Sequence, residues 1–185
     1  MGKLFIVTGP SGAGKDSVIN RVRERGLAFG QVITTSTRPQ RTNEHQGDPY
    51  YFLTREDFQN KVAQGEMVEW AEVYGNLYGC TKAEVESKLK QHDIVIVKVD
   101  PQGARSYKKI RPEATTIFIM PPSYAYLEKR LINRETDTEE VIKQRLTTAQ
   151  RELENLLDWD YLVVNEEGKL NEAAEEVVTI IKEKG

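Results

Sequence analysis

The sequence lacks the residues that an internal disulfide, a histidine-rich metal centre or a membrane span would need. Only one of the 185 residues is a cysteine, Cys80, and a single cysteine cannot form an internal disulfide. The two histidines, His45 and His92, are too few for a His-rich metal centre, and neither is spaced from Cys80 as zinc ligands are. The apolar run 4–7 is too short for a signal peptide or a membrane span. We therefore expect a cytoplasmic protein with no membrane partner.

An excess of positive charge is missing as well. The 26 lysines and arginines are outnumbered by 29 aspartates and glutamates, which gives a net charge of −3. Nonspecific nucleic-acid binding favours a basic surface, so no nucleic-acid partner is expected. What is present is an ordinary globular composition, with 38% apolar and 30% charged residues. The length fits one domain with a substantial core.

Short apolar segments alternate with amphipathic segments along the chain. Two capping boxes, Thr54 with Asp57 and Thr81 with Glu84, indicate helix starts. The alternation favours an α/β fold with a mostly parallel core sheet flanked by helices, and the strand-rich block 34–80 interrupts it as an inserted lobe. The predicted strands are 4–8, 32–36, 50–53, 67–73, 94–99, 115–120 and 161–164. The predicted helices are 16–25, 54–65, 81–91, one after Asp100, one after Ser123, 137–157 and 171–184.

A glycine-rich segment joins the first predicted strand to the first predicted helix. It reads Gly9-Pro10-Ser11-Gly12-Ala13-Gly14-Lys15, which is the G-x-x-x-x-G-K pattern of a phosphate-binding loop in the required context. Glycines let backbone amides wrap closely around phosphate oxygens. The helix N-terminus adds a positive dipole end, and Lys15 adds a point charge. We therefore predict a nucleotide-phosphate site at this loop.

The position after Lys15 departs from this pattern. The motif uses Ser or Thr there to hold Mg²⁺, but this chain has Asp16 followed by Ser17. Asp16 is either a favourable acid in the first helical turn or a group near the metal. A carboxylate that faces phosphates repels them unless a cation lies between, so both Asp16 and Ser17 are candidate metal ligands.

A second basic segment lies in the inserted lobe. Arg38 and Arg41 stand three apart in a loop stiffened by Pro39, and Tyr50 follows. Guanidinium groups pair bidentately with phosphate oxygens, and a tyrosine hydroxyl adds a neutral donor. The segment therefore suits a phosphate monoester, and the alternative is a solvated basic loop.

Glu69 is a candidate reader of a nucleotide base, because it lies in a predicted strand of the same lobe. A carboxylate accepts two hydrogen bonds, and guanine offers adjacent donors at N1 and N2. Adenine presents an acceptor at N1, which would face the carboxylate unfavourably. The alternative interpretation of Glu69 is a solvated surface acid.

Together these motifs resemble guanylate kinase, the family that phosphorylates GMP with ATP. The resemblance covers nearly the whole chain, in the family's order. The loop alone occurs in many enzymes, whereas the combination is highly specific. Beyond the loop, the matching motifs are Thr37-Arg38-Pro39-Gln40-Arg41 with Glu44 and Gly47, Tyr50-Tyr51-Phe52, Glu69-Trp70-Ala71, Gly75-Asn76-Leu77-Tyr78-Gly79, Asp100-Pro101-Gln102-Gly103-Ala104, Pro121-Pro122-Ser123 and Val163-Val164-Asn165.

The resemblance implies the roles of the substrate-binding residues. The groups around the GMP phosphate would be Arg38, Arg41, Tyr50 and Tyr78, with Glu44 in the same substrate-binding set. The groups around the guanine base would be Thr34, Glu69, Cys80 and Asp100, and Asp100 would also lie near the metal.

The resemblance also implies a donor site and a lid. The residues 9–17 would hold the ATP phosphates, and Asn165 would lie near the adenine. The lid would close arginines over the transferring phosphoryl group: Arg130, Arg134 and Arg145. For Arg145 the alternative is an ordinary helix-surface charge. The catalytic set would be Lys15, Arg38, Arg130 and Arg134.

A single guanylate-kinase-like domain is therefore expected. Its core would comprise 1–33, 81–120 and 151–185, its GMP-binding lobe 34–80 and its lid 121–150. The reaction would transfer the γ-phosphoryl group of ATP to GMP or dGMP, giving ADP and GDP. Mg²⁺ would lie near Ser17, Asp16 and Asp100, and the chain would act as a monomer or a homodimer.

Three positions depart from the family's pattern. Asp16 replaces a small residue or Ser, Cys80 replaces a Ser or Thr hydroxyl, and Lys98 stands where an acid is usual. A thiol is the weaker donor, and Cys80 is alternatively a small residue that only packs in the core. Lys98 either neutralises the charge of Asp100, binds phosphate or extends into solvent without a role in the site.

Two other functions stay open from the sequence. The Gly-Lys-Asp-Ser sequence of the loop also resembles related kinases that act on ribose 1,5-bisphosphate. A non-catalytic guanylate-kinase-like binding module is the second alternative, although it would need neither Lys15 nor the lid arginines.

Overall fold

The computed structural model of the chain describes residues 1–73, 75–132, 139–153 and 156–185. The chain divides into two compact units. The first unit comprises Met1–Leu4, Phe29–Val97 and Arg105–Ala114, and it contains the predicted lobe 34–80. The second unit comprises Phe5–Ala28, Lys98–Ala104 and Thr115–Gly185, and it contains the predicted lid 121–150. The single-domain organisation stays a prediction.

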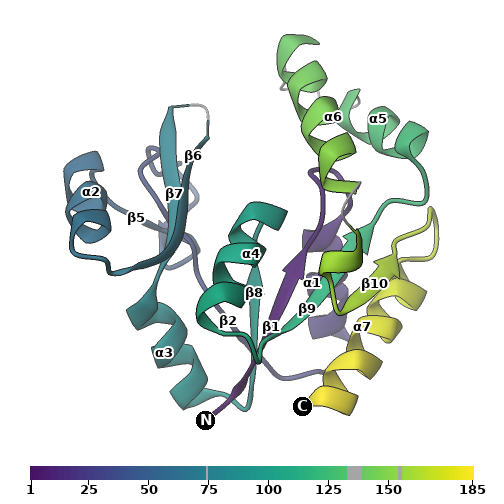
Figure 1. The fold of residues 1–185 in the computed structure, drawn as a ribbon, viewed down its shortest axis with the longest axis horizontal. Coiled ribbons are helices and arrows are strands. Elements are labelled where there is room, and N and C mark those ends of the chain that lie inside the picture. The colour runs from purple at the N-terminus through teal and green to yellow at the C-terminus, as the bar shows by residue number, and fades with distance from the viewer. Residues whose placement is uncertain (74, 133–138, 154–155) are drawn as a thin grey trace. The chain divides into compact units, whose positions relative to one another are not determined.

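The α/β fold predicted from the alternation is confirmed (Figure 1). The described strands form two five-stranded sheets, with the orders β10-β9-β1-β8-β2 and β4-β5-β3-β7-β6. The strands are β1 Lys3–Thr8, β2 Gly30–Gln31, β3 Thr35–Ser36, β4 His45–Gln46, β5 Pro49–Phe52, β6 Met67–Val73, β7 Asn76–Thr81, β8 Ile94–Lys98, β9 Thr115–Met120 and β10 Tyr161–Val164. The helices are α1 Lys15–Glu24, α2 Arg55–Ala63, α3 Lys82–Gln91, α4 Pro101–Ile110, α5 Tyr124–Ile132, α6 Glu139–Leu153 and α7 Leu170–Lys184. None of the helices described is long and apolar enough to cross a bilayer.

At both predicted capping boxes the threonine side chain caps the helix start. The Thr54 side chain accepts a hydrogen bond from the Asp57 amide at the start of α2, and the Thr81 side chain accepts one from the Glu84 amide at the start of α3. Each hydroxyl satisfies an amide that has no partner within the helix. The start that Asp137 predicts for the long lid helix lies outside the described residues.

In the first unit, an antiparallel hairpin of β6 and β7 carries three of the predicted site residues, Glu69, Tyr78 and Cys80. The pairing runs from Met67 opposite Thr81 to Val73 opposite Asn76, with a register shift between Met67 and Glu69. Helix α2 packs against this hairpin through a buried cluster of Phe58, Met67 and Leu77 (Figure 1). The hairpin therefore has a rigid backing of apolar side chains.

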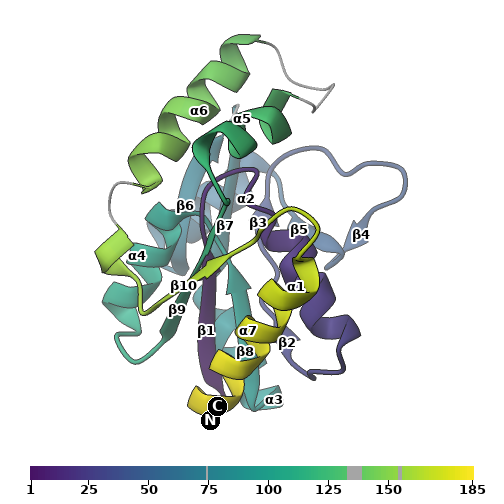
Figure 2. The same ribbon diagram turned by 90° about the vertical axis from the view of Figure 1, so that its right-hand side faces the viewer.

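In the second unit, parallel strands position the glycine-rich loop. Strand β9 pairs in parallel with both β1 and β10, and parallel pairing places their carboxyl ends at one edge. Helices α1 and α7 lie side by side (Figure 2). Leu127 and Leu131 of α5 pack against Ala149 of α6, which joins the two lid helices.

The continuous strand predicted at 32–36 is correct only at its end, where β3 covers Thr35–Ser36. The chain changes sheets there, because the Val32 amide donates to the Ile96 carbonyl and the Thr34 carbonyl accepts from the Tyr51 amide. Two short strands, β2 and β3, flank this crossing. The long helix predicted to reach 157 is described as far as Leu153, and a 3-10 turn covers Leu156–Asp158.

Candidate functional site

The glycine-rich loop has a backbone that only glycine adopts without strain. It joins the end of β1 to the start of α1, and its glycines have φ values of +136° at Gly9, +89° at Gly12 and +88° at Gly14. A Cβ on Gly9 would lie 2.2 Å from the Ile119 carbonyl oxygen. The glycine spacing of the motif is therefore required by conformation and by close packing.

The loop encloses a pocket of about 390 Å³ lined by Ser11, Gly12, Gly14, Lys15, Asp16, Ser17 and Arg130. The Lys15 ammonium donates to the carbonyls of Gly9 at 2.5 Å and Pro10 at 3.1 Å. Burial lowers the pKa of Lys15 to about 8, although the Glu152 carboxylate opposes this shift. An ammonium withdrawn from water in this way is well placed to bind an anion.

Two side chains from distant parts of the chain contact the loop. Arg130 of α5 donates to the Gly12 carbonyl at 3.3 Å and to the Tyr126 hydroxyl at 3.1 Å. Its guanidinium also lies 4.5 Å from the centre of the Tyr126 ring, which fixes its plane. Asn165, 2% exposed, donates to the Ala13 carbonyl at 2.9 Å. Of the other predicted lid arginines, Arg134 lies outside the described residues. Arg145 is half-buried on α6.

The three candidate metal ligands do not form a metal cage. Asp16 is exposed and forms an ion pair with Lys98, Ser17 lines the pocket, and an Asp100 oxygen accepts from the Gly103 amide at 2.7 Å. Asp100 thus caps α4, the helix that the sequence predicts after it. Among the described residues no group of three or more His, Cys, Asp or Glu side chains could hold a metal ion. Any Mg²⁺ here would need most of its ligands from phosphates and water.

In the first unit, Arg38 is held in a fixed orientation by a carboxylate and two aromatic rings. Its two terminal nitrogens donate to Glu44, at 2.8 Å and 2.6 Å. Its guanidinium carbon lies 5.1 Å from the Tyr50 ring centre and 5.3 Å from that of Phe52. The Tyr50 ring contacts Tyr78 edge-on at 6.0 Å. Three of the predicted phosphate-binding residues, Arg38, Tyr50 and Tyr78, are therefore brought together.

The structure places Glu44 as the partner of Arg38 in this lobe. Besides its bonds to Arg38, it accepts from the backbone amide of Arg41 at 2.9 Å. The Arg38 guanidinium lowers the pKa of Glu44 to about 2, and the Arg41 amide adds to the shift. Phe52 is a residue that the site prediction omitted. Its signal in the sequence is the two-residue spacing from Tyr50, which puts both rings on one face of a strand.

We expect the carboxyl group of Glu44 to titrate near pH 2 in the native protein, and its pKa to rise toward the ordinary value in Arg38→Met, stopping short of it because the Arg41 amide still donates to the carboxylate. A lowered pKa means that the ion pair stabilises the fold above the ordinary carboxyl range and stops doing so as the pH falls through about 2. Carbon-13 NMR of the labelled side chain measures both values. Arg55→Met, which removes a partner of Glu72, should leave Glu44 unchanged. An ordinary pKa for Glu44 in the wild-type protein would contradict the pairing.

The predicted base-binding residues lie on neighbouring strands of the first unit. Glu69 of β6 is half-buried and pairs in register with Cys80 of β7, and the half-buried Thr34 precedes β3. Cys80 is 1% exposed, and burial raises the pKa of its thiol to about 12. The fully buried Tyr107 of α4 lies beside it, and burial likewise raises the pKa of that phenol. Tyr107 has no motif around it, so nothing in the sequence identified it.

We expect the thiol of Cys80 to resist iodoacetamide at pH 7.5 in the folded protein. With its pKa raised to about 12 by burial, about one thiol in ten thousand or fewer is ionised, and the thiolate is the reactive form. Mass spectrometry should find labelling only after denaturation. Rapid labelling of the folded protein, slowed by saturating GMP, would instead place the sulfur at an open base pocket.

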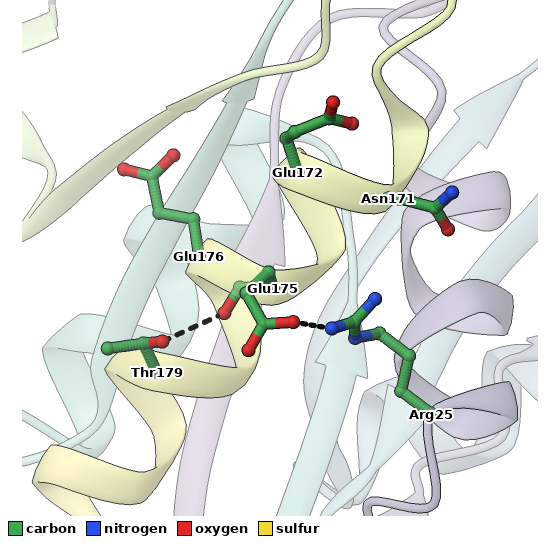
Figure 3. Close-up of a pocket in the computed structure, with 6 residues that line it drawn as sticks. All are labelled: Arg25, Asn171, Glu172, Glu175, Glu176 and Thr179. Atoms are coloured by element: carbon green, nitrogen blue, oxygen red, sulfur yellow. Dashed lines mark hydrogen bonds and ion pairs between the residues drawn. The ribbon is translucent and has the colours of Figure 1, made fainter.

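A second pocket of the second unit is lined by several carboxylates and is poorly suited to phosphate. It lies between the end of α1 and α7, and it is lined by Arg25, Asn171, Glu172, Glu175, Glu176 and Thr179 (Figure 3). Arg25 is already paired with Glu175, and the Thr179 hydroxyl donates to the Glu175 carbonyl at 3.0 Å. The remaining carboxylates would repel an anion. The loop pocket is therefore the better phosphate site of the two.

Comparison with known proteins bears on both sites. The guanylate kinase family model matches residues 1–184. A guanylate kinase of Thermotoga maritima is 41% identical over 181 residues, covering 98% of this chain and 86% of the relative. One from Hydrogenovibrio crunogenus is 43% identical over 164 residues, covering 89% and 80%. A crystal structure of guanylate kinase from Anaplasma phagocytophilum is 29% identical, with a TM-score of 0.76 and coverage of 99% of this chain and 86% of that one.

These matches span both units and include both sets of site residues. The relatives are covered over most of their own length, so the likeness is not confined to the widespread phosphate loop. The chain belongs to the guanylate kinase family.

Proposed function

We propose that this chain is an ATP:GMP phosphotransferase whose donor site is the glycine-rich loop and whose acceptor site is the lobe 34–80. The observation that carries the proposal is the family match over residues 1–184 in a chain that keeps the whole loop with Lys15. Neither alternative from the sequence, a ribose 1,5-bisphosphate kinase or a non-catalytic module, is favoured by these relatives.

On the donor side, the loop and the lid would share the phosphates of ATP. Lys15 would exchange the carbonyls of Gly9 and Pro10 for phosphate oxygens, and Arg130 would approach from the lid, where it already contacts the loop. Phosphoryl transfer asks little covalent chemistry of a protein, so positioning and charge neutralisation dominate. Arg134 would act with Arg130, and Asn165 would support the loop near the adenine.

Mg²⁺ fits this site as an ion held mainly by the donor phosphates and water, because the described residues offer no cage of their own. The groups that would hold it are the Ser17 hydroxyl and the carboxylates of Asp16 and Asp100. When bound, it would neutralise charge on the phosphates.

On the acceptor side, the fixed guanidinium of Arg38 would receive the GMP phosphate together with Arg41, Tyr50 and Tyr78. Two aromatic rings and Glu44 orient Arg38 before substrate arrives, which reduces the ordering cost of binding. Glu69 would accept the two donors of guanine, with Thr34, Cys80 and Asp100 around the base. Arg145 would add positive charge from α6. No general base is needed, because a phosphate nucleophile is already ionised.

A panel of acceptors tests the function. With ATP and Mg²⁺, release of ADP should depend on GMP or dGMP and should not occur above background with AMP, UMP or ribose 1,5-bisphosphate. Phosphorus NMR of the product should show a nucleoside diphosphate. Transfer to ribose 1,5-bisphosphate without transfer to GMP would support the other kinase, and GMP binding without any transfer would support the binding module.

We further infer a cytoplasmic enzyme that acts as a monomer or homodimer. The cytoplasmic location is inferred from the proposed substrates, because ATP and GMP are both metabolites of the cytoplasm. Light scattering on the purified protein, with and without both nucleotides, measures the mass directly, and a trimer or larger species would contradict the proposal.

A further inference from the structure

Two of the positions that depart from the family's pattern contact each other in the second unit. Asp16 and Lys98 are 82 positions apart in the sequence, and their side chains form an ion pair. Asp16 belongs to the first turn of α1, directly after Lys15, and Lys98 is the last residue of β8. An acid at position 16 and a base at position 98 are each unusual for the family, but together they carry no net charge.

The pair reaches the phosphate pocket through Asp16. The Asp16 side chain lines the pocket and is 75% exposed, whereas that of Lys98 is 30% exposed. Both charges act on Lys15, after the larger effect of burial: Lys98 lowers the pKa of its ammonium and Asp16 raises it. The two opposite charges are therefore within electrostatic range of the group that would contact phosphate.

An unpaired carboxylate at this position would oppose phosphate binding. A polyphosphate carries several negative charges, and at low ionic strength the repulsion from one more is weakly screened, because the Debye length is about 30 Å at 0.01 M salt. An ammonium in contact with the carboxylate cancels most of that repulsion. An exposed ion pair contributes little to folding stability, so the stability of the fold does not explain why both charges lie at the pocket.

We propose that Lys98 is a positioning residue that neutralises Asp16, so that the loop can bind the polyphosphate of the donor nucleotide despite an acid beside Lys15. The two charges compensate each other. Phosphate binding should therefore survive removal of both charges, but it should weaken when Lys98 alone is removed. This inference rests on the proposed function of the loop as the donor site.

The test is the affinity for ADP, measured by isothermal titration calorimetry without metal and at low ionic strength. Lys98→Met should weaken binding by on the order of tenfold, because it leaves Asp16 unneutralised. Asp16→Asn should bind at least as tightly as wild type. The double variant Asp16→Asn with Lys98→Met should return to within about threefold of wild type. Inorganic tripolyphosphate should give the same order, since the effect concerns phosphate and not the base.

Arg25→Met is the matched control. Arg25 forms an ion pair with Glu175 beyond the C-terminal end of the same helix α1 (Figure 3), and its loss changes the net charge as Lys98→Met does. ADP affinity should stay within about twofold of wild type. Lys98→Gln, with its thermal midpoint checked, provides a second neutral variant at the same position.

Two results would overturn the proposal. If the double variant binds ADP as weakly as Lys98→Met, Lys98 itself contacts phosphate and Asp16 is irrelevant. If Lys98→Met binds like wild type, the pair is an ordinary surface ion pair. The acceptor panel separates this proposal from the function, because ADP affinities in the expected order can coexist with a failure to phosphorylate GMP.

Discussion

Lys15→Ala should lower kcat/KM for ATP by about a hundredfold or more, while the protein remains folded. Removal of one group that stabilises charge in the transition state typically costs about 10²–10³ in rate. Lys15 is the cation that the loop itself holds, bonded to two of its carbonyls and lining the pocket. Steady-state kinetics with GMP as acceptor measure the loss, and circular dichroism with a thermal melt establishes that the fold is retained.

Affinity for GMP should change little in this variant, since most of the proposed acceptor residues, Arg38 and Glu69 among them, belong to the other unit. Lys169→Ala is the control, because Lys169 is an exposed lysine paired with Glu166 in the same unit as the loop. Its kinetics should match wild type. Near-normal turnover in Lys15→Ala would show that the loop does not hold the donor phosphates.

Glu69→Gln should reduce the preference for GMP over AMP by between about fivefold and a hundredfold. A carboxylate presents two acceptors to the adjacent donors of guanine, whereas an amide presents one acceptor and one donor. A mismatched partner in a buried site costs about 1–3 kcal/mol, which corresponds to this range. Glu69 is half-buried on the rigid hairpin of β6 and β7, so the strand fixes the position of the changed group.

Glu72→Gln on the same strand is the matched control for Glu69. Glu72 lies three residues further along β6, on the other face, and pairs with Arg55 in an exposed position. It should leave the ratio of kcat/KM values for GMP and AMP unchanged. If that ratio is equally unaffected by Glu69→Gln, Glu69 does not read the base, and the specificity lies in other residues of the lobe.

The parts of the fold that depend on short-range order were predictable from the sequence. The caps at Thr54 and Thr81 need only a hydroxyl three residues before an amide that lacks a partner. The glycine-rich loop was equally readable, because its conformation and its phosphate chemistry use the same few neighbours. The motif order then identified the family, which the comparisons confirm.

What the sequence left open depends on contacts between distant segments. The crossing between sheets at Val32–Thr34 carries the same β-branched pattern as a continuous strand, and only its partners at Ile96 and Tyr51 divide it. The three alternatives for Lys98 could not be separated until its neighbour Asp16 was known. Tyr107 stands in a helix among charged residues, with nothing in its local pattern to place it against Cys80.

The surroundings of Gly14 have a consequence for how this loop can change over time. A Cβ there would lie 2.4 Å from the Asn165 amide nitrogen and 3.1 Å from an Arg130 nitrogen, and that amide donates to Ala13. A mutation to alanine would therefore displace residues from the last strand region and from the lid at once. Because φ at Gly14 is +88°, replacing Asn165 or Arg130 would not by itself make alanine acceptable there, so a descendant of this chain that lost its catalytic role would still favour glycine at this position.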